Sequence, residues 1–75
     1  MLDANGIAIR LGHRVAIGGG IEGKVVFSID TDEFSPAFPK ADWDNLGRGI
    51  MIETDAAGLI HLEGSGDDLT ILSVA

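Results

Sequence analysis

The sequence predicts an all-β domain, a small antiparallel barrel of five or six short strands with one long acidic loop. Short segments alternate apolar and polar residues, glycine-rich and acidic turns separate them, and no stretch keeps a helical apolar period for three turns. Closing such a sheet buries a core and removes its edges. With 75 residues and no cysteine for a disulfide, we expect one domain over residues 1–75 with a thin core.

The first two strands are expected at residues 13–17 and 24–30. Both segments alternate, and in the second the side chains of Val25, Phe27 and Ile29 are predicted to share one face. The connection between the two strands is short and rich in glycine. A parallel crossover would need far more chain, so these two strands are predicted to form an antiparallel hairpin.

A long loop is predicted at residues 31–46, where sustained alternation stops and Pro36 and Pro39 occur. Loops of this length in a compact domain are usually functional or contain a short turn. We expect a helical turn near residues 43–46.

The remaining strands are expected at residues 50–52, 59–62 and 69–74, each bounded by turn-forming residues. Residues 7–11 form a sixth candidate, because they alternate directly after an Asn-Gly turn signal. The sequence leaves the choice between five and six strands open.

Residues 11–17, followed by 22–27, resemble the opening hairpin of SH3-like barrels of the KOW and CAP-Gly kind, a strand, a glycine turn and then Gly-x-Val. Trp43 and the segment 49–53 continue this layout, so the resemblance spans residues 11–72 loosely. It implies the fold alone. The Gly-Lys-Asn-Asp-Gly run of CAP-Gly domains is missing, and the acidity of the chain argues against a KOW-type role on ribosomal RNA.

The charge is strongly negative, with twelve Asp and Glu against five Lys and Arg, a formal net charge of −7. Residues 1–29 carry two acids and three bases, a sum of +1, whereas residues 30–75 carry ten acids and two bases, a sum of −8. This imbalance opposes direct binding to nucleic-acid phosphates. The acids select a basic partner or simply keep a small protein in solution.

Two motif matches carry no chemistry in this context. Gly18, Gly20 and Gly23 have the G-x-G-x-x-G spacing of a dinucleotide site, but a strand follows instead of the helix N-terminus that would face the pyrophosphate. The segment that begins at Asp30 starts like a calcium loop, yet Ser35 stands where that loop needs glycine.

No catalytic or metal site is expected. His13 and His61 are the only imidazoles, and a transition-metal site would need both of them plus carboxylates. Serine occurs without a nucleophile signature, and a chain of this size lacks a pocket of the usual volume. We therefore expect no enzyme activity and no cofactor.

The candidate binding site is the long loop, where aromatic residues, which anchor interfaces, interleave with acids, which select a basic partner. Large aromatics are mostly buried, so the alternative is that these rings fold inward as a lid over the open end of the barrel, with Trp43 as the best candidate. Two acids of the following hairpin complete the predicted set, which is Asp30, Asp32, Glu33, Phe34, Phe38, Asp42, Trp43, Asp44, Glu53 and Asp55.

The hypothesis is a non-enzymatic binding protein that engages a basic surface, such as that of a nucleic-acid-binding protein, as inhibitors that mimic nucleic acid do. Small acidic chains of this kind resemble phage and mobile-element products, including anti-CRISPR proteins. The alternative is an SH3-like structural or adaptor module that assembles through its strand edges. No signal-peptide pattern or membrane-length apolar run occurs, so we expect a cytoplasmic protein without a membrane partner, as a monomer or homodimer.

Overall fold

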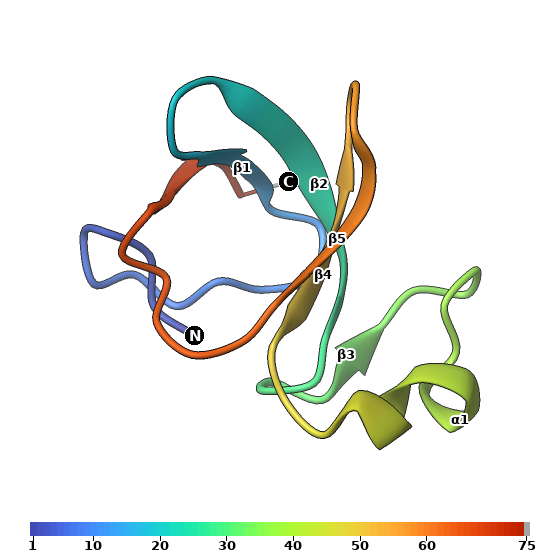
Figure 1. Cartoon of the computed structure of the whole chain (residues 1–75). Helices are drawn as coiled ribbons and strands as arrows, with labels where there is room; N and C mark the ends of the chain where they lie inside the picture. The colour runs from blue at the N-terminus through green and yellow to red at the C-terminus, as the bar shows by residue number, and fades with distance from the viewer. Residues whose placement is uncertain (75) are drawn as a thin grey trace.

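A computed structural model describes residues 1–74, which form one antiparallel sheet with a short helical turn beside it (Figure 1). The prediction of an all-β domain is confirmed at this level. The elements in chain order are β1 (Arg14–Ile17), β2 (Ile21–Ser28), β3 (Glu33–Phe34), α1 (Lys40–Trp43), the 3-10 turn η1 (Asp44–Leu46), β4 (Ile50–Thr54), β5 (Gly58–Leu62) and β6 (Leu69–Ser73).

The sheet does not close. Its order is β5-β4-β2-β1-β6, with β3 paired to β2 off this path, so β5 and β6 are the two ends. A closed barrel was predicted because closure removes edges, and that prediction is not confirmed. The end of β6 is instead covered by the N-terminal segment, since the amide of Ala4 donates to the carbonyl of Leu69 at 2.7 Å.

The candidate strand at residues 7–11 does not form in the described part of the chain, where this region contributes an isolated bridge between Leu2 and Ala8. The same stretch instead places Ile9 in the core with no exposed surface. Asp3 stabilises the turn that precedes Ile9, because its buried carboxylate accepts hydrogen bonds from the amides of Asn5 and Ile7 at 2.9 Å. The same carboxylate also accepts the amide of Ile71 in β6 at 3.1 Å. These bonds, that from Ile7 foremost, lower the pKa of Asp3.

β2 is the central strand, and it pairs along both of its sides. Its first half pairs with β1, its last two residues pair with β3, and β4 runs along the opposite side (Figure 1). The hairpin predicted between the first two strands is confirmed, but β2 begins three residues before the expected position, which shortens the connection to Gly18–Gly20. The expected helical turn is present and begins at Lys40, earlier than predicted.

A β-bulge in β2 divides the apolar residues of the sheet between two faces. Val25 pairs with Ile52 and Phe27 with Met51, so Val26 is an extra residue opposite β4. Val25 lies in a core with Ile9, Val15, Ile50, Ile52 and Leu69, whereas Val26, Phe27 and Met51 form a second cluster. The prediction that Val25, Phe27 and Ile29 share one face is therefore wrong, because one inserted residue reverses the side on which all later side chains point.

Among the described residues, no helix is long and apolar enough to cross a membrane.

The tight packing of β2 against β4 makes Gly23 a sensitive position. A Cβ atom there would lie 2.6 Å from the carbonyl oxygen of Glu53 and 2.7 Å from Cγ2 of Ile52. We predict that Gly23→Ala lowers the free energy of unfolding by about 1–3 kcal/mol, the usual cost of forced overpacking. Urea denaturation measures this.

The matched control is Gly19→Ala in the turn before β2, where a Cβ would meet nothing within 4 Å. That substitution should change the free energy of unfolding by less than about 1 kcal/mol. Equal stability of the two variants would contradict the close approach of β2 and β4 at Gly23.

Candidate functional site

The segment between β2 and β4 folds back on the outer face of the sheet, where an aromatic cluster of Phe27, Phe34, Phe38 and Trp43 holds it. The ring centroid of Phe27 lies 5.4 Å from that of Phe34, 5.5 Å from that of Trp43 and 6.1 Å from that of Phe38. Phe27 is fully buried and the other three rings are partly buried. We call residues 30–47, which this cluster attaches to the sheet, the acidic lobe.

The three aromatic residues predicted to contact a partner are thus used for packing inside the molecule. The alternative prediction, that these rings turn inward as a lid, agrees with their packing against the protein. The surface that they cover is the outer face of β2, however, and not the end of a barrel. The reason is the bulge at Val26, which turns Phe27 to that face and gives the rings of the lobe an apolar surface to cover.

Two acids of the predicted site join the acidic lobe to the N-terminal part of the chain. The Glu33 carboxylate accepts Nε and Nη2 of Arg10 at 3.0 and 2.9 Å, Oγ1 of Thr31 at 2.7 Å and the amide of Leu11 at 3.2 Å. These contacts, with Arg10 first, lower the pKa of Glu33 to about 2. They are charge-assisted bonds, which are the stronger kind.

Asp30 makes the second such connection. Its Oδ1 accepts the amide of Gly49 at 3.0 Å, and its Oδ2 lies 3.1 Å from the N-terminal ammonium group of Met1. The bond from Gly49 is the largest cause that lowers the pKa of Asp30. Asp30 therefore fixes the start of the acidic lobe to its end at β4 and to the N-terminus.

Five of the ten acids in residues 30–75 form ion pairs. Besides Asp30 and Glu33, Asp32 lies 2.6 Å from Nζ of Lys40, Asp55 pairs with Arg14, and Glu63 with Arg48. Nearby basic groups therefore neutralise half of the ten acids in this part of the chain. Within residues 1–74, the acids of this half with no basic group inside 4.0 Å are Asp42, Asp44, Glu53, Asp67 and Asp68.

The predicted site residues that keep a free charge lie mainly on the helical turn of the acidic lobe. Asp42 and Asp44 flank Trp43, and both are exposed. Lys40 begins the same helical turn, and its pKa is raised by Asp32 and, to a smaller extent, by Asp44. Three carboxylates against one ammonium leave two negative charges in excess here.

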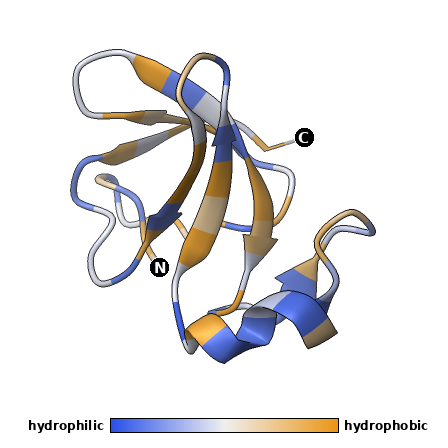
Figure 2. Cartoon of the chain, turned by 45° about the vertical axis from the view of Figure 1, so that its right-hand side comes forward, coloured by the Kyte–Doolittle hydropathy of each residue, from blue (hydrophilic) through white to orange (hydrophobic). Residues whose placement is uncertain are grey.

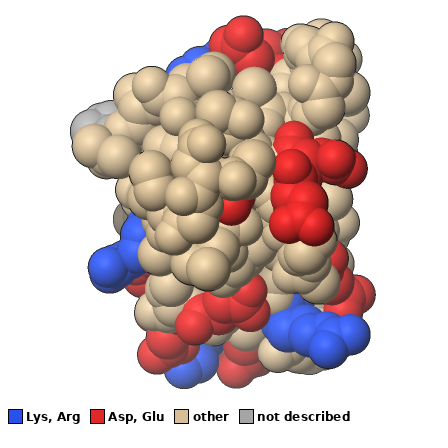
Figure 3. All heavy atoms as spheres, turned by 90° about the vertical axis from the view of Figure 1, so that its left-hand side faces the viewer, with Lys and Arg blue, Asp and Glu red and all other residues tan. Residues whose placement is uncertain are grey.

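On the side of the molecule away from the lobe, the acids do not form one continuous surface. Figure 3 shows one side of the molecule on which acidic groups lie in separate patches, with basic groups beside them toward the lower end and a broad area free of both. Figure 2 shows the lobe as a projection beside the largely hydrophobic strands, with several hydrophilic residues on its helical turn.

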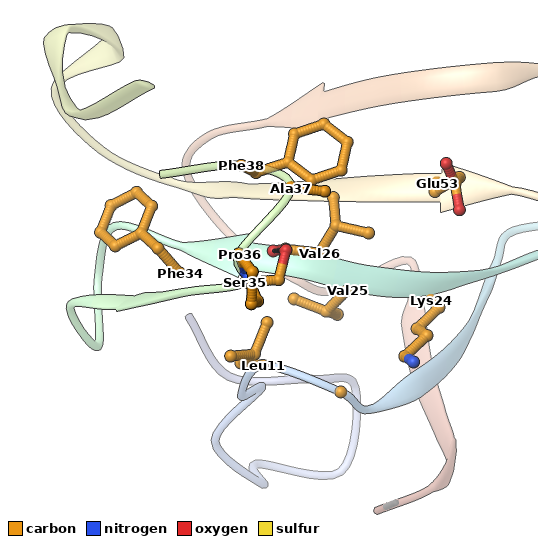
Figure 4. Close-up of a pocket in the computed structure, with 11 residues that line it drawn as sticks. Leu11, Lys24, Val25, Val26, Phe34, Ser35, Pro36, Ala37, Phe38 and Glu53 are labelled. Atoms are coloured by element: carbon orange, nitrogen blue, oxygen red, sulfur yellow. Dashed lines mark hydrogen bonds between the residues drawn. The ribbon is translucent and has the colours of Figure 1, made fainter. Parts of the chain in front are cut away.

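A groove of about 430 Å³ lies beside the acidic lobe, at the point where β1 leaves β2 and the chain after β3 begins. Leu11 and Phe38 lie on opposite sides of it, Val26 lies between them, and Lys24 and Glu53 lie together at one end (Figure 4). Sequence analysis missed this groove, because it depends on the bulge at Val26 and on the folded position of Phe38.

Lys24 differs from the other basic side chains of the chain. It is paired across the sheet with Glu53, yet it is the one Lys or Arg in residues 1–74 without a carboxylate inside 4.0 Å. The groove therefore presents one hydrogen-bond donor and one acceptor next to an apolar floor.

The two histidines each make a hydrogen bond to a backbone group. Nδ1 of His13 accepts the amide of Arg10 at 3.1 Å, and Nε2 of His61 is bonded to the carbonyl of Arg48 at 2.9 Å. Over residues 1–74, no group of three His, Asp or Glu side chains could hold a metal ion.

Comparisons with family models, with curated proteins and with solved structures find no match for this chain.

The lowered pKa of Glu33 predicts how stability depends on pH. A carboxyl whose pKa is lower in the folded state stabilises the fold above its unfolded value, about 4.5, and loses that effect as the pH falls toward 2. We predict that Glu33→Gln is less stable than the unmodified chain at pH 7 and that the difference shrinks from pH 4.5 to pH 2. Urea titrations at several pH values measure it.

Glu53→Gln serves as the control, because Glu53 is exposed and has no basic group inside 4.0 Å among the described residues. Its stability at pH 7 should match that of the unmodified chain. A constant difference between Glu33→Gln and the unmodified chain at every pH would contradict the proposed role of the Arg10 contact.

Proposed function

We propose that this protein is a non-enzymatic binding protein whose acidic lobe engages a basic surface on another protein. One observation carries the proposal. The basic groups of the chain are used in internal ion pairs, with Lys24 as the exception in residues 1–74, whereas Asp42 and Asp44 stay exposed and unpaired. A partner thus meets free negative charge, and repulsion from the net charge of −7 disfavours nucleic acid.

The aromatic cluster supports this proposal in a different way from the one expected. Because Trp43 packs 5.5 Å from Phe27 and 5.7 Å from Phe38, the turn that carries Asp42 and Asp44 is attached to the sheet before any partner arrives. Binding then costs little ordering entropy. Carboxylates held in this way steer a basic surface and could stand in for phosphates, so competition with nucleic acid for a basic protein belongs to the proposal, as does an origin among phage or mobile-element inhibitors.

A labelled oligolysine peptide tests the acidic lobe. We predict that D42K/D44K weakens its binding by about tenfold or more at low salt, because two favourable charges become unfavourable, and that raised salt weakens binding to the unmodified chain. Fluorescence anisotropy measures both. Circular dichroism confirms that the variant keeps its sheet.

The matched control is D67K/D68K, which changes the net charge equally at two exposed, unpaired acids outside the lobe. It should weaken binding several times less than D42K/D44K does. Equal losses in the two variants would show that net charge alone attracts the peptide and would contradict a specific role for the lobe.

An adaptor function is the second candidate, and the groove favours it. In this account the chain is an SH3-like module, as the resemblance of its opening hairpin suggests, and the groove binds an uncharged extended peptide. The donor of Lys24 and the acceptor of Glu53 suit a backbone carbonyl and amide, and the apolar floor at Val26 suits apolar side chains. Such binding is only weakly sensitive to salt.

A substitution that fills the groove separates the two functions. Ala37 lines the groove and is exposed, so Ala37→Trp should occupy the space without disturbing the core. For an adaptor we predict that the blocked peptide acetyl-Leu-Ala-Leu-Ala-amide shifts the amide resonances of Val26 and Phe38 in the unmodified chain and no longer does so in A37W. Unchanged resonances in the unmodified chain would count against the adaptor and leave the acidic lobe untouched.

A further inference from the structure

The outer side of β5 is an unpaired strand edge. Residues 58–62 pair with β4 on their inner side, and the carbonyl of Gly58 also accepts Oγ1 of Thr54. Within residues 1–74, the backbone of this strand makes no further hydrogen bond in a turn or loop. The backbone groups that point away from β4 are therefore free to pair with another strand.

The other end of the sheet does not offer the same opportunity. On the outer side of β6, the carbonyl of Leu69 accepts the amide of Ala4, and the amide of Ile71 donates to Asp3. The N-terminal segment thus covers that edge, and β5 is the sheet end left for an additional strand.

β5 also lacks the features by which edge strands usually avoid pairing. It contains no lysine, no arginine and no proline, and its pairing with β4 runs without a bulge. Its side chains are apolar apart from His61, and Leu59 has 46% of its surface exposed. Such an edge is predicted to pair unless something covers it.

The absence of charge on β5 makes this edge the place where two copies of the chain can approach with little repulsion. Two copies of a chain with net charge −7 repel each other through their acidic surfaces, so an uncharged surface on both copies favours their contact. β5 carries no Asp, Glu, Lys or Arg. The acids nearest to this edge are Glu63, which follows β5 and pairs with Arg48 at 3.0 Å, and Glu53 on β4, opposite Leu59. In a β5-to-β5 contact the two β4 strands are three strand spacings apart, roughly 14 Å, which exceeds the screening length of about 8 Å in physiological salt.

We propose that two copies of this chain pair antiparallel through β5 about a two-fold axis, so that the two sheets become one. In a pair centred on Ile60, Leu59 of one copy stands opposite His61 of the other, because the strand runs in opposite directions on the two sides. Each half-exposed Leu59 then gains a cross-strand neighbour on the same face. The contact is self-complementary, as a two-fold interface requires.

The pairing extends the proposed function without depending on it. It places an acidic lobe on each copy of one assembly, and two lobes held together bind a repeated basic surface more tightly than one lobe does. Salt distinguishes the two interactions, since raised salt weakens binding of the lobe and does not weaken the contact between uncharged strands.

Sedimentation equilibrium of the full chain over a range of concentrations tests the proposal. The unmodified chain should have twice the monomer mass at high concentration, and raised salt should leave the dimer intact or strengthen it. Leu59→Lys should raise the dissociation constant at least tenfold, because it places a charge beside the shared edge in each copy. Circular dichroism verifies that the variant remains folded.

Leu72→Lys is the matched control, since Leu72 has 48% of its surface exposed on β6, at the covered end of the sheet. This variant should dimerise as the unmodified chain does. A monomer at every concentration, a series of larger species in place of a discrete dimer, or equal weakening by Leu59→Lys and Leu72→Lys would overturn the proposal.

Discussion

The bulge at Val26 is the constraint on which the rest of the molecule depends. It lets Val25 face one side of the sheet and Phe27 the other within a single strand. A small sheet with one apolar face would leave its second face to water. Here the second face carries Phe27 and Met51 and therefore needs a cover, which the 30–47 segment supplies through Phe34, Phe38 and Trp43. A chain of this length gains a second core by this means.

The charges of the chain serve the fold before they serve a partner. Glu33 and Asp30 connect the acidic lobe to Arg10 and to the N-terminal ammonium group, which lie far away in the sequence. Asp3 joins the N-terminal turn to β6 by a hydrogen bond that its carboxylate accepts from the amide of Ile71. These contacts join segments that are distant in the sequence, and within residues 1–74 ion pairs engage every Lys and Arg side chain except Lys24. The negative net charge is therefore not diffuse, but is left at a few acids that no base neutralises.

The alternation of side chains predicted most of the strands, because a half-buried strand must alternate wherever it forms. It could not predict the bulge, since Val25, Val26 and Phe27 are all apolar and fit either face. The direction of Phe27 also decides where Phe34, Phe38 and Trp43 pack, so the sequence could not choose between the two predictions for these rings. The ion pairs of Asp30, Glu33 and Asp55 join segments distant in sequence, so no local pattern announces them.

The surface of the molecule has a charged part at the acidic lobe and an uncharged part at the open edge of the sheet. Pairing of bases with acids leaves the excess charge at a few acids, with Asp42 and Asp44 of the acidic lobe among them, whereas β5 at one end of the sheet carries no formal charge. Because like charges keep copies apart everywhere else, the uncharged edge is where a copy can approach, and the lobe is where a basic partner can. The two surfaces use different forces, so a change in ionic strength weakens one while it spares the other.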